Sequence, residues 1–223
     1  MFKKRSSVLI FLGVVMLTLA ACSWTQDAAS KPVKQIQKQP KEEQQNEQIQ
    51  PAEELTPTLK ESAAQVMTAL KAGDMNTLAG WLSSDGVRFS PYANINTKTD
   101  IVLASDELEG SMADTKKRVW RTFPGTDDLI ELTYSEYHKQ FVYDADFIKD
   151  AEISVNEELG EGAMIGNLNE VYPKDSYDFV EYHIAGTDPS AEGRDWRSLR
   201  LVFEKVGDDH IKLAGIIHDQ WTP

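Results

Sequence analysis

The stretch that follows Pro57 carries apolar residues at helical spacing. Thr58 and Glu61 form a capping box at its start. The apolar positions that follow recur every three or four residues: Leu59, Ala63, Val66, Met67 and Leu70. Gly73 is expected to end this helix, and Asp74 to cap a second helix directly after it. The second helix carries its apolar face on Met75, Leu78, Ala79 and Leu82. The pattern therefore predicts two consecutive helices at the start of the domain.

The middle of the chain has weaker patterning. We expect short strands at 87–90, 101–103 and 129–132 and a single helical turn from Ser105. A second capping box, formed by Thr133 and Glu136, predicts a helix that carries Tyr137 and Phe141 on one face. The segment through Trp120 and Phe123 is interpreted as a long loop with two aromatic residues.

The C-terminal part alternates apolar and polar residues, which is typical of half-buried strands. The expected strands cover 151–155, 180–184, 199–203 and 211–217. Turns are predicted at the glycine-rich stretch 160–166 and at Gly207-Asp208-Asp209. Antiparallel strands of this kind need a helical layer to cover their apolar face, so the sequence predicts an α+β domain.

The first residues follow a third pattern. Lys3, Lys4 and Arg5 precede an apolar run at 8–19, and Leu19-Ala20-Ala21-Cys22 closes it. A charged start, a short apolar core and small residues are the parts of a secretory signal. The run is shorter than the roughly 20 apolar residues that a membrane-spanning helix needs. An uncleaved N-terminal membrane helix remains the alternative.

Leu19-Ala20-Ala21-Cys22 resembles the lipobox of bacterial lipoprotein precursors. The resemblance implies cleavage before Cys22, a diacylglycerol on its sulfur and attachment to the extracytoplasmic face of the cell membrane. Two or more acyl chains give stable attachment, whereas one chain gives only reversible binding. Cys22 is the only cysteine, so no disulfide can form within the chain.

Three regions follow from these patterns. Residues 1–21 are expected to be the signal peptide, and residues 22–56 the lipidated cysteine with a tether. The tether is rich in Gln, Lys, Glu and Pro, a composition that favours disorder over a packed core. It lacks the sustained apolar heptads of a coiled coil. Residues 57–223 are long enough for a single domain.

The charge balance narrows the possible partners. The chain has a formal net charge of −13, and removal of the three cations of the leader would bring it near −16. Such an acidic protein is a poor partner for nucleic acid or for an anionic lipid surface. We expect the bilayer, reached through acylated Cys22, and an envelope protein or glycan as partners.

The order of elements resembles the NTF2-like superfamily. The resemblance depends on two opening helices, the Lys71-Ala72-Gly73-Asp74 break between them and a sheet that ends in a long hairpin. It implies N-terminal helices packed on a curved antiparallel sheet, with a concave pocket for small ligands or acid–base chemistry. A cystatin-like or other α+β fold is the alternative. Fold alone does not determine function.

His218-Asp219 and Asp144 are the candidate acid–base residues. The pair resembles the His-Asp motif of metal phosphohydrolases, but adjacent strand residues point to opposite faces of a sheet. Only a bulge would bring these two side chains together. Either residue, together with a pocket acid such as Asp144, could still act in general acid–base catalysis.

Asp144, Asp146 and Asp150 suggest a calcium loop. The EF-hand pattern fails, because Ile148 and Lys149 occupy the positions that need an oxygen ligand and a glycine. A looser calcium site is the alternative to solvated carboxylates, and no other cofactor is expected. The sequence also lacks the G-x-S-x-G and H-E-x-x-H motifs of serine hydrolases and zinc proteases.

Trp120, Trp196 and Trp221 are candidate ligand-binding residues. Indole rings beside carboxylates suit sugars or protein interfaces, although tryptophans also fill cores. A non-enzymatic binding module of the cell envelope is therefore the favoured function. The alternative is an envelope hydrolase or isomerase that uses the His and Asp groups of a pocket.

Overall fold

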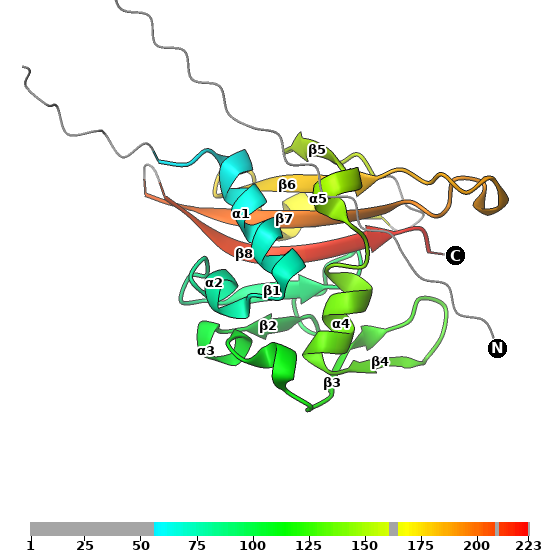
Figure 1. Ribbon diagram of the computed structural model, residues 1–223, viewed down its shortest axis with the longest axis horizontal. Coiled ribbons are helices and arrows are strands. Elements are labelled where there is room, and N and C mark those ends of the chain that lie inside the picture. The colour runs from blue at the N-terminus through cyan, green and yellow to red at the C-terminus, as the bar shows by residue number, and fades with distance from the viewer. Residues whose placement is uncertain (1–55, 161–164, 208–209, 223) are drawn as a thin grey trace, which may run out of the picture. The chain divides into compact units, whose positions relative to one another are not determined.

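A six-stranded sheet is the centre of the domain in the computed structural model, which describes residues 56–160, 165–207 and 210–222 (Figure 1). Its strand order is β2-β1-β8-β7-β6-β5. These strands are β1 (Val87–Ser90), β2 (Ile101–Leu103), β5 (Glu152–Val155), β6 (Tyr177–Ile184), β7 (Arg197–Val206) and β8 (His210–Gln220). The leader, Cys22 and the tether lie outside the described residues, as do 161–164 of the glycine-rich turn and 208–209 of the hairpin turn. No helix in the described part is long and apolar enough to span a membrane.

The α+β class is confirmed, but the expected all-antiparallel sheet is wrong. Four of the five neighbouring pairs are antiparallel, whereas β1 runs parallel to β8. A parallel pair needs a long connection, and residues 91–209 supply it. The result is an open, mixed sheet.

A separate two-stranded hairpin replaces the loop that was expected around Trp120. It consists of β3 (Arg118–Thr122) and β4 (Leu129–Leu132), which pair in antiparallel fashion. The register shifts between Val119 and Arg121, as at a β-bulge. The prediction of a loop for this stretch is therefore wrong. The bulge interrupts the alternation of apolar and polar residues that would have indicated a strand.

The capping residues and the glycine in the sequence predict the first helices correctly. Thr58 caps α1 (Leu59–Ala72): its side chain accepts from the Glu61 backbone, and the Glu61 carboxylate accepts from the Thr58 N–H at 2.8 Å. Gly73 follows in the left-handed conformation, with φ of 65°. The remaining α-helices are α2 (Met75–Ala79), α3 (Ser105–Leu108), α4 (Tyr134–Phe141), α5 (Phe147–Asp150) and α6 (Leu168–Val171), with two 3₁₀ turns at Ser111–Ala113 and Pro189–Ala191. The four-residue helices α5 and α6 are too short to show a period in the sequence.

Both faces of the sheet are covered. Helices α1, α4 and α5 lie on the face seen in Figure 1 and enclose the larger core. A smaller core forms on the opposite face around Ile95, Leu168, Tyr172, Phe179, Val202 and Ile217. Strand β8 contributes to both, since Ile216 belongs to the larger core and Ile217 to the smaller.

Candidate functional site

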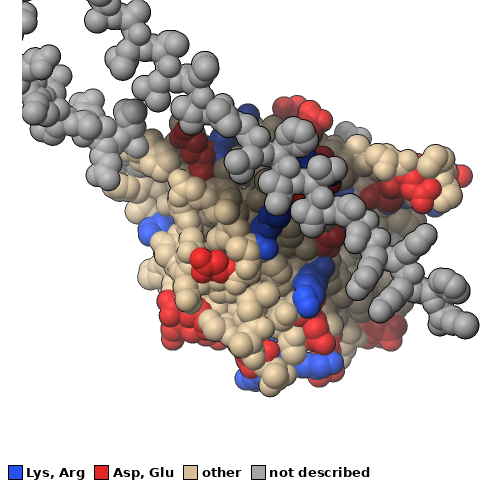
Figure 2. Space-filling model, viewed as in Figure 1, with Lys and Arg blue, Asp and Glu red and all other residues tan. Residues whose placement is uncertain are grey.

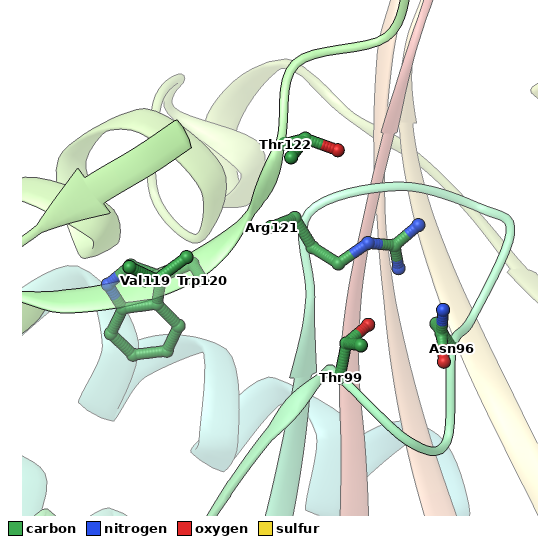
Figure 3. A pocket seen from close by; sticks show the side chains of 6 residues that line it. All are labelled: Asn96, Thr99, Val119, Trp120, Arg121 and Thr122. Atoms are coloured by element: carbon green, nitrogen blue, oxygen red, sulfur yellow. The ribbon is translucent and has the colours of Figure 1, made fainter. Parts of the chain in front are cut away.

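The candidate site is a cavity of about 290 Å³ between β3 and the segment that follows β1 (Figure 3). It is lined by Asn96, Thr99, Val119, Trp120, Arg121 and Thr122. The volume is near the lower end of ligand cavities, which run from roughly 300 to 1,000 Å³. A small ligand is therefore the appropriate size class.

Arg121 is held in this cavity by a buried carboxylate. One terminal nitrogen, Nη1, donates to Oδ1 of Asp100 at 2.7 Å and to the Asn94 carbonyl at 3.2 Å. The Asp100 side chain is fully buried, and its other oxygen accepts from the Asn96 N–H at 2.7 Å. The guanidinium carbon lies 5.8 Å from the centre of the Tyr92 ring. These contacts fix the orientation of the guanidinium before any ligand arrives.

The bulge in β3 helps to aim this arginine. Bulges re-aim side chains and recur next to functional sites. Figure 3 shows Arg121 extended toward Asn96, with Thr99 and Thr122 on either side. Both hydrogen bonds of the Arg121 side chain come from Nη1, and no described residue accepts a hydrogen bond from its Nε or Nη2. The cavity can therefore offer guanidinium N–H groups, hydroxyls and an amide to a ligand that presents acceptor oxygens.

Among the described residues that line this cavity, none carries a carboxylate. Asp100 sits behind Arg121 and makes its contacts through Arg121 and the Asn96 backbone. The lining is therefore one guanidinium, neutral polar groups and the apolar side chains of Val119 and Trp120. In an acidic protein, this combination favours a ligand with a carboxylate or similar planar oxygen pair.

Asp219 belongs instead to a buried ionic cluster on the face opposite α1. Nη2 of Arg200 lies 3.1 Å from Asp219, 3.3 Å from Glu181 and 3.5 Å from Glu158. Glu181 also accepts from the N–H groups of Leu159 and Gly160, at 2.8 and 3.1 Å. Burial raises the pKa of Asp219, and the charge of Arg200 opposes this effect. The cluster fastens the segment 157–160 to the sheet.

His218 lies on the other face and is fully buried. Its Nδ1 is 3.4 Å from the Pro91 carbonyl, and its Nε2 is 3.5 Å from Oδ2 of Asp144. The same Asp144 oxygen accepts from Arg197 at 2.7 Å. Burial would raise the pKa of Asp144, but His218 and Arg197 outweigh it and hold that pKa below its usual value.

His218 and Asp219 thus point to opposite faces, as strand alternation predicts. The structure does bring His218 and Asp144 together. Neither His218, Asp144 nor Asp219 lines the Arg121 cavity. Both side chains of this pair are engaged with protein partners, since Asp144 also accepts from Arg197 and His218 lies near the Pro91 carbonyl.

The three carboxylates of the suggested calcium loop have separate partners. Asp144 pairs with Arg197, Asp146 with Lys71 and Tyr143, and Asp150 with Lys149. Within the described ranges, no group of three or more His, Cys, Asp or Glu residues is placed to hold a metal ion.

The three candidate tryptophans lie in different environments. Trp120 is 1% exposed and stacks on Tyr137, with ring centres 3.8 Å apart. Its indole N–H donates to the Leu132 carbonyl, so only part of the ring reaches the cavity. Trp196 is buried beside His183, with ring centres 5.9 Å apart. Trp221 is half-buried under the guanidinium of Arg194 at 5.2 Å.

Asp100, Asn96, Thr99 and Arg121 did not stand out in the sequence. Asp100 and Arg121 are distant in the chain, and neither belongs to a recognisable motif. Their pairing depends on β3, which the sequence pattern predicts as a loop, whereas the expected strand at 129–132 is present as β4.

Comparisons with known proteins do not assign the chain to a family. No protein-family model matches the chain, and no curated protein matches it at a significant level.

Proposed function

We propose that this chain is a lipid-anchored, extracytoplasmic binding module of the cell envelope. Acylated Cys22 would attach it to the bilayer, and residues 23–56 would tether the domain. The Arg121 cavity would bind a small ligand through a carboxylate or an equivalent pair of acceptor oxygens. The signal-like leader and its Leu-Ala-Ala-Cys ending support the anchor.

The fixed arginine is the observation that carries the binding proposal. Nη1 of Arg121 donates to Asp100 and to the Asn94 carbonyl. The rest of the guanidinium lies in the cavity with Thr99, Thr122 and Asn96. An arginine pre-oriented in this way loses little conformational entropy when it binds a planar acceptor pair. A surface arginine without such a support loses more conformational entropy on binding, so it contributes less to affinity.

Binding is favoured over catalysis by the position of the ionisable groups. General acid–base chemistry needs such groups in contact with a substrate and with pKa values near the working pH. His218, Glu181 and Asp219 are buried and engaged with protein partners, and the Asp144 side chain, 10% exposed, is paired with Arg197 and His218. The residues of the described ranges that line the Arg121 cavity include no Asp, Glu or His.

An NTF2-like arrangement is the finer fold that we propose. It is supported by the helices α1 and α2 that precede the sheet and by the long β7–β8 hairpin that ends it. In such a fold, a binding pocket beside the sheet is expected. The parallel β1–β8 pair and the open mixed sheet are compatible with other α+β folds as well.

The surface gives further support to a ligand other than nucleic acid. On the face in Figure 2, the described residues show basic and acidic side chains in separate small groups around a broad uncharged area. A nucleic-acid partner would need a continuous basic surface. An envelope protein or glycan remains the proposed macromolecular partner.

Amide NMR shift mapping tests the binding proposal. Acetate, succinate and benzoate would be titrated separately into the isotope-labelled chain, with methylammonium as the control. The proposal predicts saturable shifts concentrated at residues 96–100 and 119–122 for at least one carboxylate. Shifts spread over the surface, or none that saturate, would refute it.

A further inference from the structure

A second cavity of about 230 Å³ lies beside the smaller core, and its described lining residues all differ from those of the first. Its lining includes Asp85, Arg88, Tyr172, Tyr177 and Glu204. We propose that this cavity is a separate binding site for a neutral, hydroxyl-rich ring, that is, a sugar. This proposal does not depend on the function of the Arg121 cavity.

Two tyrosine rings form an aromatic wall. Tyr172 and Tyr177 meet edge to face, with ring centres 5.1 Å apart and an angle of 69°. The Tyr172 hydroxyl donates to the Ala214 carbonyl at 3.4 Å, which ties the ring to β8. The two rings stand at an angle to each other, so they form an apolar corner that can contact the C–H groups of a ligand.

Gly215 makes the position of Tyr172 possible. A Cβ atom at residue 215 would lie 2.9 Å from the Tyr172 hydroxyl oxygen and 3.2 Å from its ring. Any side chain there would push the ring away from the strand. The aromatic wall is therefore built into the backbone, at a strand position where glycine otherwise weakens a sheet.

Donors and acceptors both face this cavity. Arg88 is anchored by the Thr97 and Asp100 carbonyls at 3.4 and 3.5 Å. The carboxylates of Asp85 and Glu204 line the same space, and no described residue pairs with Glu204 in an ion pair or side-chain hydrogen bond. One guanidinium and two carboxylates thus lie around a pair of phenols.

The phenols act as neutral hydrogen-bonding groups. Burial raises the pKa of Tyr177, and the charges of Glu204 and Asp85 add to this effect. Burial raises the pKa of Tyr172 to about 12, against the opposing charge of Arg88. Both hydroxyls therefore keep their protons near neutral pH. Tyr172 donates its proton to the Ala214 carbonyl, and the Tyr177 hydroxyl can donate to a ligand.

The mixture of groups selects the class of ligand. A simple anion would meet the two carboxylates, and an amine would meet the Arg88 guanidinium. A sugar hydroxyl both donates and accepts, so one hydroxyl can bind a carboxylate and another the guanidinium. Its ring C–H groups suit the tyrosine faces. A neutral sugar satisfies all of these groups at once.

Saturation-transfer NMR on the full chain in detergent is the test. Glucose and N-acetylglucosamine would be the probes, with methylammonium and acetate as charged competitors. We expect saturable transfer to the ring C–H protons of at least one sugar, unaffected by either competitor. The absence of saturable transfer to both sugars, or displacement of the sugar by methylammonium, would overturn the proposal.

Matched variants locate the site. Glu204→Gln removes a charged acceptor and should weaken sugar binding about tenfold, whereas Glu131→Gln on the exposed side of β4 should leave it unchanged. Tyr177→Ala should abolish ring-proton transfer, and Tyr177→Phe, which keeps the ring, should retain most of it. Equal binding in the wild type, Glu204→Gln and Tyr177→Ala would place the sugar elsewhere and refute the assignment.

Discussion

Replacement of Arg200 by methionine tests the reading of the buried ionic cluster. The Arg200 side chain is 1% exposed, that of Glu181 0% and that of Asp219 6%. Removal of one partner from a buried ion pair leaves an uncompensated charge and costs about 3–5 kcal/mol. Methionine is flexible and fills much of the arginine stem's volume, so the packing loss should be smaller. We expect the free energy of unfolding at pH 7.5 to fall by about 3–5 kcal/mol.

The loss should depend on pH in a defined direction. Burial already raises the pKa of Asp219 above its ordinary 3.8, and loss of the Arg200 charge removes the effect that opposes this rise. A raised acid pKa penalises the folded state at pH values above the folded pKa, and the penalty disappears as pH falls toward the unfolded value. The deficit of Arg200→Met relative to wild type should therefore shrink at acid pH.

Urea denaturation followed by circular dichroism measures both effects. A chain that begins at Ser23 would be compared at pH 7.5 and pH 5.0, with Arg118→Met as the control. Arg118 is partly exposed and lies 3.5 Å from Glu107, so its loss should cost at most about 1 kcal/mol. A deficit below about 1 kcal/mol for Arg200→Met, or one equal at the two pH values, would show that Arg200 does not compensate the buried carboxylates.

Three further changes test other parts of the account. Cys22→Ala should move the protein from the membrane to the soluble fraction; unchanged fractionation would contradict the lipid anchor. Asp100→Asn should lower the free energy of unfolding by about 1.5–3 kcal/mol, because Arg121 loses its charged partner; a stability equal to wild type by urea denaturation would count against that support. Gly215→Ala should cost about 1–3 kcal/mol by the same assay, since its Cβ would crowd Tyr172; a neutral effect would show that the ring moves freely.

The sequence identified the features that depend on neighbouring residues. The capping boxes at Thr58 and Thr133 were correct, because a cap needs only residues three positions apart. Gly73 was expected to end α1, and it adopts the left-handed conformation there. The opposite orientations of His218 and Asp219 followed from the period of a strand.

The features that depend on distant residues were missed. The parallel pairing of β1 with β8 joins opposite ends of the domain, and no local pattern encodes it. The bulge at Trp120 broke the alternation that would have revealed β3. Asp100 and Arg121 meet only because that hairpin packs near the segment after β1, so their pairing could not be read from the chain.

The decisive measurement is the contribution of Arg121 to ligand affinity. Isothermal titration would compare wild type, Arg121→Gln and Arg118→Gln with whichever carboxylate saturates the NMR shifts. We expect at least tenfold weaker binding for Arg121→Gln, because a charge-assisted contact is lost, and unchanged binding for Arg118→Gln on the same strand. Equal affinities in all three proteins would contradict the claim that this cavity binds its ligand through Arg121.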